Sequence, residues 1–387
     1  MIINSNFLVA LFYYIKRNVL KHFKRSPFFF RFIDEYKFWA AKKLKKSIYA
    51  YFSSGSDDEL TLKENCSAYD RIKLVPRVLK NVISCDVSTR ILDCPIAFPL
   101  IIAPTAFHKL VHPAGELITA KAASKEGIIM TVSSCSTTSL KSIRDASVLP
   151  PWFQLYVYKD RSITQNLILK ATELNYGAIV VTVDAPLYSK RPKEIHHPLT
   201  FLHKELFENL MEAGLSFKGV PPEEIPQFLA AQLDPSLDWD DIEWIRSQTD
   251  LPVVLKGILH PADIKKAKYH GIKTIVISNH GGRQLDTAIT APETLKNVDT
   301  QIKEEMEIII DGGIRKGIDI LKAIALGAKA VMIGRPILWG LACEGEQGIL
   351  NVLNQLKEEL ILSMTLSGVS RIEEITEDIL YKQRIKE

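Results

Sequence analysis

Residues 274–286 read Thr-Ile-Val-Ile-Ser-Asn-His-Gly-Gly-Arg-Gln-Leu-Asp, an apolar run that leads into a loop carrying His280 and Arg283. A short run rich in β-branched residues predicts a buried strand, and Gly281 and Gly282 permit a sharp turn between the two polar side chains. Histidine titrates near neutrality and arginine offers a planar fork of N–H donors, so the pair suits removal of a proton from a bound carboxylic acid. A plain loop with a structural arginine is the alternative interpretation of this motif taken alone.

Seven similar apolar runs alternate with segments of helical periodicity, of which 262–270 and 317–326 are examples. The seven runs are 100–103, 128–132, 152–156, 178–183, 252–255, 307–310 and 330–333. Together with 274–277 they form eight strand–helix units. This pattern predicts an α/β fold of the (β/α)8 TIM-barrel type.

Polar or reactive side chains stand at or just after the end of every run. They are Thr105, Ser133, Gln154 with Tyr156, Asp184, Lys256, His280, Asp311 and Arg335. The carboxyl ends of the strands meet at one face of a barrel, which is where barrel enzymes carry their active sites. We therefore expect these side chains to surround one pocket.

The loops after the last two runs carry the features of a phosphate site. They read Asp311-Gly312-Gly313-Ile314-Arg315 and Gly334-Arg335-Pro336, and so supply free backbone N–H groups, a close approach without Cβ atoms, and two guanidinium groups. The chain has no Walker motif and no dinucleotide Gly-x-Gly-x-x-Gly motif, so the phosphate is expected on a mononucleotide or a sugar phosphate.

Bulk composition narrows the function class. The chain has 387 residues, 47% of them hydrophobic, and a net charge of +4 that is too small and dispersed to indicate nucleic acid as the main partner. Its five cysteines form no Cys-x-x-Cys pair, which favours a reducing compartment, with the cytoplasm as the default. The adjacent His196 and His197 lack a helical partner histidine, so no metal site is predicted.

Residues 1–33 form a predicted N-terminal helical extension ahead of the barrel domain at 34–387. Phe7 to Ile15 is an unbroken apolar run, basic residues follow it up to Arg31, and no acid precedes Asp34. Nine apolar residues are too few to span a bilayer as a helix, which takes about 20. Two interpretations stay open: peripheral membrane contact through residues 7–31, and an extra helix packed on the body of the protein.

With these motifs in this order, the sequence resembles the FMN-dependent 2-hydroxy-acid oxidase and dehydrogenase family, which includes glycolate oxidase, lactate oxidase and flavocytochrome lactate dehydrogenase. The resemblance runs from about residue 34 to 374. It rests on eight segments in order: 51–55 with Tyr51, 103–106, 153–156, 182–186, 255–257, 278–286, 311–315 and 333–336. All eight together are far more specific than any one of them.

The resemblance implies catalytic roles for His280, Asp184 and Tyr156. His280 would take a proton from the substrate, Asp184 would stabilise the imidazolium that forms, and Tyr156 would bond the substrate hydroxyl. The substrate carboxylate would be held by three side chains, Tyr51, Arg191 and Arg283, with two parallel N–H donors coming from Arg283.

The resemblance also implies an FMN site. Lys256 would lie beside the N1 and O2 edge of the flavin and stabilise negative charge there. The other residues that it assigns to the cofactor are Ala103, Pro104, Thr105, Ala106, Ser133, Gln154 and Thr182 around the ring, Ser278, Asp311 and Arg315 at the ribityl and phosphate end, and Gly312, Gly313, Gly334 and Arg335 in the phosphate loops. Barrels of this family commonly form tetramers, so a homo-oligomer is expected.

Three departures from the family pattern bear on specificity. Cys135 replaces a large aromatic residue and Phe107-His108 replaces Met-Gln, which predicts a wider pocket and a 2-hydroxy acid larger than glycolate. Lys190 precedes Arg191 where the family has arginine. The excursion at 195–235 contains a segment, 199–217, that is expected to form an amphipathic helix over the site and to act as a lid.

The predicted activity is FMN-dependent oxidation of an (S)-2-hydroxy acid to the 2-oxo acid, with reoxidation of the flavin by oxygen. A lactate-type dehydrogenase that passes electrons to a quinone or cytochrome at a membrane is the first alternative. A flavin-free phosphate-binding lyase or isomerase and a catalytically silent flavoprotein scaffold are remoter ones.

Overall fold

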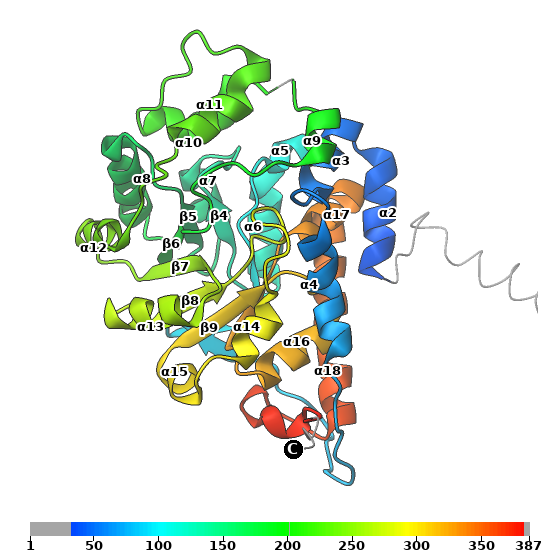
Figure 1. Cartoon of the computed structure of the whole chain (residues 1–387). Helices are drawn as coiled ribbons and strands as arrows, with labels where there is room; N and C mark the ends of the chain where they lie inside the picture. The colour runs from blue at the N-terminus through cyan, green and yellow to red at the C-terminus, as the bar shows by residue number, and fades with distance from the viewer. Residues whose placement is uncertain (1–31, 201, 383–387) are drawn as a thin grey trace, which may run out of the picture.

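The chain folds as the predicted (β/α)8 barrel in a computed structural model that describes residues 32–200 and 202–382 (Figure 1). Eight parallel strands lie in the order β3-β10-β9-β8-β7-β6-β5-β4, and a bridge between Ile102 and Met130 joins the two ends of the sheet. The strands are β3 (Leu100–Ile102), β4 (Thr131–Ser133), β5 (Trp152–Leu155), β6 (Ala178–Thr182), β7 (Val253–Ile258), β8 (Thr274–Ile277), β9 (Glu307–Asp311) and β10 (Ala330–Ile333).

One helix follows each strand and packs on the outside of the barrel. In strand order these helices are α6 (Gly115–Lys125), α7 (Leu140–Ala146), α8 (Arg161–Glu173), α12 (Trp239–Ser247), α13 (Pro261–Tyr269), α14 (Ala291–Lys296), α16 (Gly317–Ala325) and α17 (Arg335–Glu344). Additional elements decorate this core: α2 (Ile33–Lys43), α3 (Lys46–Ser53), α4 (Leu60–Arg71), α5 (His108–Val111), α15 (Thr300–Glu305), α18 (Glu346–Ser367), η3 (Ile372–Glu374) and η4 (Glu377–Ile379).

The interior of the barrel is filled with apolar side chains, and its amino-terminal end is closed. Strand residues alternate between inside and outside, and the inward positions hold a buried cluster: Ile101, Ile129, Trp152, Ala178, Val180, Val254, Val276, Ile309, Ala330 and Met332. The hairpin of β1 (Thr89–Ile91) and β2 (Cys94–Ile96) adds Ile91 and Ile96 to this cluster. The hairpin therefore forms a floor, and open space remains at the opposite end.

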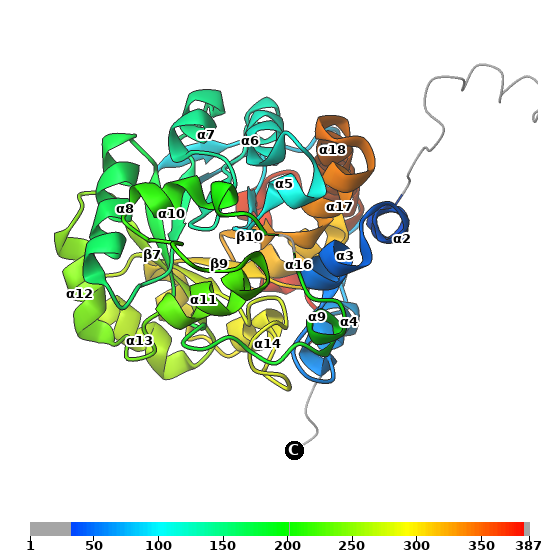
Figure 2. The same cartoon turned by 90° about the horizontal axis from the view of Figure 1, so that it is seen from above.

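The excursion after β6 lies over the carboxyl ends of the strands, as Figure 2 shows from above. It contains α9 (Pro192–His196), η1 (Lys204–Phe207), α10 (Glu208–Glu212), η2 (Pro222–Glu224) and α11 (Ile225–Gln232). The single amphipathic helix expected at 199–217 is wrong: η1 and α10 together end before Gly214, whose φ of 109° cannot continue a helix. Its apolar side chains are nevertheless buried, including Phe207, Leu210 and Phe217.

The N-terminal extension stays a prediction. Its apolar and basic segments at residues 7–31 lie outside the described residues. The described part begins at Phe32, just before α2, and continues through α3 and α4. Helix α2 packs along α17, as Figure 1 shows on the side of the barrel opposite α8. Within residues 32–200 and 202–382, none of the helices has the length and apolar character needed to cross a bilayer.

The pair α17 and α18 crosses at two glycines, and this crossing supports the amino terminus of α17 at the open end of the barrel. The backbones of Gly340 and Gly348 are in contact, and a Cβ atom built on Gly348 would overlap the carbonyl group of Gly340. Both residues are buried, so the helices have no room to separate without disturbing the core.

Gly348→Ala is expected to lower the free energy of unfolding by about 2 kcal/mol, because the added methyl group overpacks a rigid helix crossing. Urea unfolding followed by circular dichroism measures the change. The neighbouring substitution Gln347→Ala, on an exposed face of α18, serves as the control and should change stability by less than about 0.5 kcal/mol. Equal stability of the two variants would contradict the tight crossing.

Candidate active site

A layer of polar side chains lies directly above the apolar interior. Gln154, Thr182, Lys256, Ser278 and Asp311 each stand two residues after an inward apolar residue of the same strand, so the period of two directs them inward as well. They bond to one another: Gln154 accepts from Ser133 at 3.1 Å and donates to Thr182 at 3.0 Å, and Lys256 donates to Ser278 at 2.9 Å. The strand pattern therefore builds a polar ring at the open end of the barrel.

Lys256 carries a buried positive charge in this ring. Its ammonium group lies 2.8 Å from Asp311 Oδ2. Burial works to lower the pKa of Lys256, but the charges of Asp311 and Asp184 outweigh it and the pKa is raised. The other oxygen of Asp311, Oδ1, is buried and has no hydrogen-bond partner within the described part of the chain, so the site holds an unsatisfied acceptor beside a fixed cation.

His280 and Asp184 form a hydrogen-bonded pair at the ends of β8 and β6. His280 Nδ1 lies 2.9 Å from Asp184 Oδ1, which leaves Nε2 as the imidazole nitrogen free to act toward the cavity. Burial works to raise the pKa of Asp184, but the charges of His280 and Lys256 prevail and lower it. The carboxylate therefore stays ionised and accepts a hydrogen bond from His280 Nδ1.

The backbone around this pair is held in uncommon conformations. His280 has a φ of 58°, followed by Gly281 at 64° and Gly282 at 72°, and Asn279 Oδ1 accepts from the Gly282 N–H at 3.1 Å to fix the turn. A left-handed histidine persists only where its surroundings enforce it, and such strain is typical of functional sites. At β7, Gly257 has a φ of 112° and lies so close to Asp184 that a Cβ atom would overlap the carboxyl group.

Arg283 reaches the cavity from the loop after β8. Its Nη1 donates to the carbonyl oxygens of Tyr51 at 2.7 Å and Ser54 at 3.1 Å, and its Nη2 donates to Glu194 at 3.1 Å. Within residues 32–200 and 202–382, no group accepts a hydrogen bond from its Nε. The Nε–H and the second Nη2 hydrogen therefore remain for a ligand, and the Tyr51 ring lies 5.2 Å from the guanidinium.

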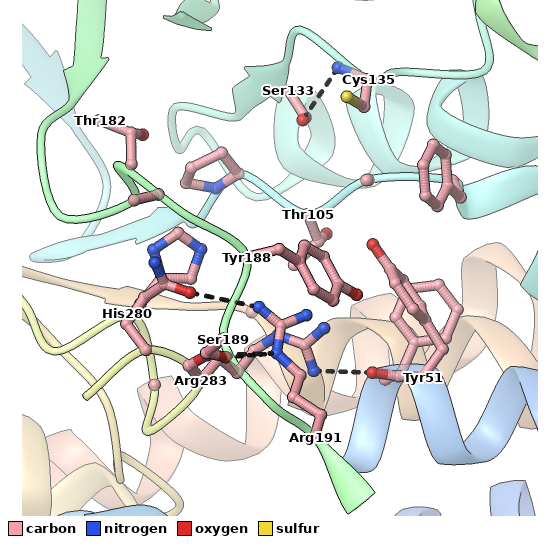
Figure 3. A pocket seen from close by; sticks show the side chains of 18 of the residues that line it. Tyr51, Thr105, Ser133, Cys135, Thr182, Tyr188, Ser189, Arg191, His280 and Arg283 are labelled. Atoms are coloured by element: carbon pink, nitrogen blue, oxygen red, sulfur yellow. Dashed lines mark hydrogen bonds between the residues drawn. The ribbon is translucent and has the colours of Figure 1, made fainter. Parts of the chain in front are cut away.

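Arg191 lies beside Arg283, and Figure 3 shows the two guanidinium groups between His280 and Tyr51. Each nitrogen of Arg191 already has a protein partner: Nε donates to Ser189 at 3.1 Å and to the Arg283 carbonyl oxygen at 3.2 Å, Nη1 to Glu194 and Nη2 to Gln284. Burial, reinforced by repulsion from Arg283, lowers the pKa of Arg191.

The loops predicted to bind phosphate line the far side of the same cavity, at the amino terminus of α17. The guanidinium of Arg335 faces the protein: it donates to the carbonyl oxygens of Phe52, Gly281 and Ser54, each at 2.9 Å. Burial, together with the neighbouring Arg283 and Arg315, lowers the pKa of Arg335 to about 9. Positive charge is therefore concentrated here beyond what the protein compensates, which favours a bound anion.

These groups surround one cavity of about 640 Å³. Its walls contain all the site residues expected from the sequence except Asp184 and Ser278. Asp184 bonds to His280, and Ser278 bonds to Lys256. Burial raises the pKa of Tyr156, so this wall residue keeps its phenol proton. Glu194 also lines the cavity and was not predicted as a site residue, although its spacing of three residues from Arg191 across the start of α9 was a signal for it.

The excursion contributes apolar side chains to the cavity lining. They are Leu199, Leu202, Pro226, Leu229 and Leu233. Cys135, from the loop after β4, belongs to the same lining. A continuous series of ring contacts links the excursion to Tyr51: Tyr51 to Phe107, Phe107 to Phe207, Phe207 to Phe217 and Phe217 to Phe228, with ring centroids 5.1–5.6 Å apart.

Comparison with known proteins gives consistent matches. A family model described as FMN-dependent dehydrogenase matches residues 40–382. The chain is 42% identical to a 2-hydroxyacid oxidase of Dictyostelium discoideum, covering 89% of this chain and 88% of that protein, and 42% identical to an L-lactate oxidase of Nostoc sp., covering 90% and 97%. The crystal structure of a mandelate oxidase with (S)-4-hydroxymandelic acid superimposes with a TM-score of 0.83 at 34% identity, covering 91% of this chain and 98% of that chain.

Inorganic phosphate at about 10 mM is expected to raise the melting temperature of the cofactor-free protein by about 2 °C at constant ionic strength, because it binds the folded cationic pocket. Arg315→Ala should remove most of this increase, whereas Arg90→Ala, exposed on the floor hairpin, should leave it unchanged. Differential scanning fluorimetry measures all three proteins. An equal rise with chloride would argue against a specific site.

Proposed function

The chain belongs to the family of FMN-dependent dehydrogenases, and from this premise we propose that it oxidises an (S)-2-hydroxy acid to the 2-oxo acid with electron transfer to oxygen. The observation that carries the proposal is the convergence of His280 and Arg283 on one cavity. A base and a carboxylate-binding fork are what removal of hydrogen from a 2-hydroxy acid requires.

The residues of the cavity fit FMN. The unpaired Oδ1 of Asp311 suits a ribityl hydroxyl group, and Lys256 suits a flavin edge that becomes negative on reduction. The cluster of Arg315, Arg335 and the amino terminus of α17 suits the phosphate. Because the Arg335 side chain already donates to three carbonyl groups, we assign its phosphate contact to the backbone N–H groups of Gly334 and Arg335.

The protein residues would hold the substrate at its carboxylate end. Arg283 would donate its Nε–H and remaining Nη2 hydrogen to the two carboxylate oxygens, a bidentate geometry that fixes orientation. The hydroxyl of Tyr51 would add a third donor. Arg191 would act mainly as electrostatic support, since each of its nitrogens has a protein partner.

His280 Nε2 would take a proton from the bound substrate, and Asp184 would stabilise the resulting imidazolium. Asp184 is a positioning residue in this scheme, because it touches His280 and not the cavity. Tyr156, which keeps its proton, would donate to the substrate hydroxyl oxygen as negative charge develops. When bound, FMN supplies the acceptor for the two electrons that leave the substrate carbon.

Oxygen as the final oxidant is supported by the names of the relatives in Dictyostelium discoideum and Nostoc sp., which are oxidases. A quinone or cytochrome is the alternative, which the basic run before Asp34 favours. The test is anaerobic bleaching of the flavin by a panel of (S)-2-hydroxy acids, followed by admission of air. Rapid return of the yellow colour, accompanied by formation of hydrogen peroxide, supports an oxidase. Slow return supports a dehydrogenase.

The same panel tests the remaining alternatives. A folded protein that stays colourless with added FMN would favour a flavin-free lyase or isomerase, and a yellow protein that no acid bleaches would favour a silent scaffold. A tetrameric state and peripheral membrane contact through residues 7–31 stay predictions.

His280→Gln is expected to keep the flavin and its yellow colour and to slow flavin reduction by about 10²- to 10⁴-fold, because glutamine fills the space but removes no proton. Stopped-flow absorbance under anaerobic conditions measures the rate. Near-normal reduction would exclude His280 as the base.

The substrate is expected to be larger than glycolate, because Cys135 has a small side chain and belongs to a cavity lining that also contains Leu199, Leu202 and Leu229. Cys135→Phe should lower kcat/KM at least tenfold for 2-hydroxyoctanoate and much less for glycolate, since a ring would fill the space for the tail. Cys135→Ser, which keeps the volume, is the control and should retain the preference for the longer acid. A wild-type preference for glycolate would contradict the wide pocket.

A further inference from the structure

A carboxylate of the protein already lies between the two arginines of the carboxylate site. Glu194 Oε1 is 3.1 Å from Arg283 Nη2 and 3.4 Å from Arg191 Nη1. Its side chain is only 13% exposed, so solvent screens these contacts weakly. No other acidic side chain forms an ion pair with either arginine in the described part of the chain.

Two further hydrogen bonds fix Glu194 in this position. The Tyr188 hydroxyl donates to Oε2 at 2.6 Å, and the Ser54 hydroxyl at the end of α3 donates to Oε1. The carboxylate thus has partners from α3, from the loop before α9 and from the loop after β8. It stands beside the free Nε–H of Arg283 without occupying it.

The net charge of the group formed by Arg191, Arg283 and Glu194 follows from its three side chains. Arg191 and Arg283 contribute two positive charges and Glu194 one negative charge. The nearby Lys193 is paired with Glu59 at 2.6 Å and is not part of the cavity lining. Arg191, Arg283 and Glu194 together therefore carry one net positive charge. The other cations of the cavity lining are Lys256, which is paired with Asp311, the exposed Lys190, and Arg315 and Arg335 at the end predicted to bind phosphate.

We propose that Glu194 is a specificity-determining residue that limits the carboxylate site to one negative charge and so selects monocarboxylates over dianionic acids. The inference rests on the proposed function, since it takes Arg283 as the group that receives the substrate carboxylate. Glu194 repels the ligand carboxylate held on the adjacent donors, and this repulsion grows with ligand charge. A dianion brings a second negative charge that Glu194 also repels, whereas a neutral tail would contact only the apolar part of the cavity lining.

The proposal has a quantitative signature. The Coulomb energy between Glu194 and a ligand grows with the ligand charge and falls with distance. Removal of the Glu194 charge should therefore tighten a dianion by a larger factor than a monoanion, up to the square of that factor if both ligand charges lay equally close. A purely structural role gives a different result, because a displaced arginine fork would weaken ligands of either charge.

The test uses the FMN-loaded protein with oxamate and oxalate, which have nearly the same shape and carry one and two negative charges. Dissociation constants come from ligand-induced changes in flavin absorbance at fixed ionic strength. For Glu194→Gln we expect about tenfold tighter oxamate binding and a larger gain for oxalate, between about 20-fold and about 100-fold, because its second charge lies farther from Glu194. The matched control is Glu223→Gln, which removes an exposed charge from the cavity rim and should change both constants less than about twofold.

Weaker binding of both ligands, or tightening of both by the same factor, would overturn the proposal. Glu194→Asp provides a second variant if the glutamine form does not fold: it keeps the charge and should keep the oxamate to oxalate ratio within about threefold of the wild type, and a tenfold shift would count against the proposal. Wild-type protein that binds neither ligand would instead overturn the proposed function itself.

Discussion

Buried positive charge is the constraint around which the open end of this barrel is organised. Lys256 and Arg191 are buried, and Arg283 and Arg335 are largely so. An ionised group in such a place is stable only with compensating partners. Asp311 compensates Lys256, and Glu194 is shared by Arg191 and Arg283. Arg335 relies on carbonyl groups of α3 and of the His280 loop, so the extra helices before the barrel are part of the site.

The same constraint explains why precise close contacts occur at the site. Gly257 allows Asp184 to approach β7, and Gly282 allows the His280 loop to approach α4, where a Cβ atom would overlap the backbone of Leu62. Such contacts leave the charged side chains little freedom to rearrange, so their orientation is fixed before a ligand arrives. Preorganised charge is the form in which electrostatics contributes most to catalysis.

The fold and most of the cavity were predictable because both depend on strand periodicity. Residues 274–277 and 330–333 have the predicted strand bounds, and the polar ring follows from the period of two at the strand ends. Glu194 was missed, and the direction of the Arg335 side chain was not foreseen, because each depends on contacts between segments distant in sequence. The segment 199–217 of the excursion was wrongly predicted as one helix, since burial of Phe207 and Phe217 is achieved by short turns as readily as by a regular helix.

The floor formed by the β1–β2 hairpin has a kinetic consequence. Ile91 and Ile96 close the amino-terminal end over an apolar interior, so in the part of the chain that the structure describes a ligand does not reach the cavity along the barrel axis from that end and arrives from the side of the strand carboxyl ends. The 2-oxo acid therefore shares its route with the oxidant that must follow. The product must therefore leave this side of the barrel before, or while, the oxidant approaches it, and the rate of product release affects the rate of turnover.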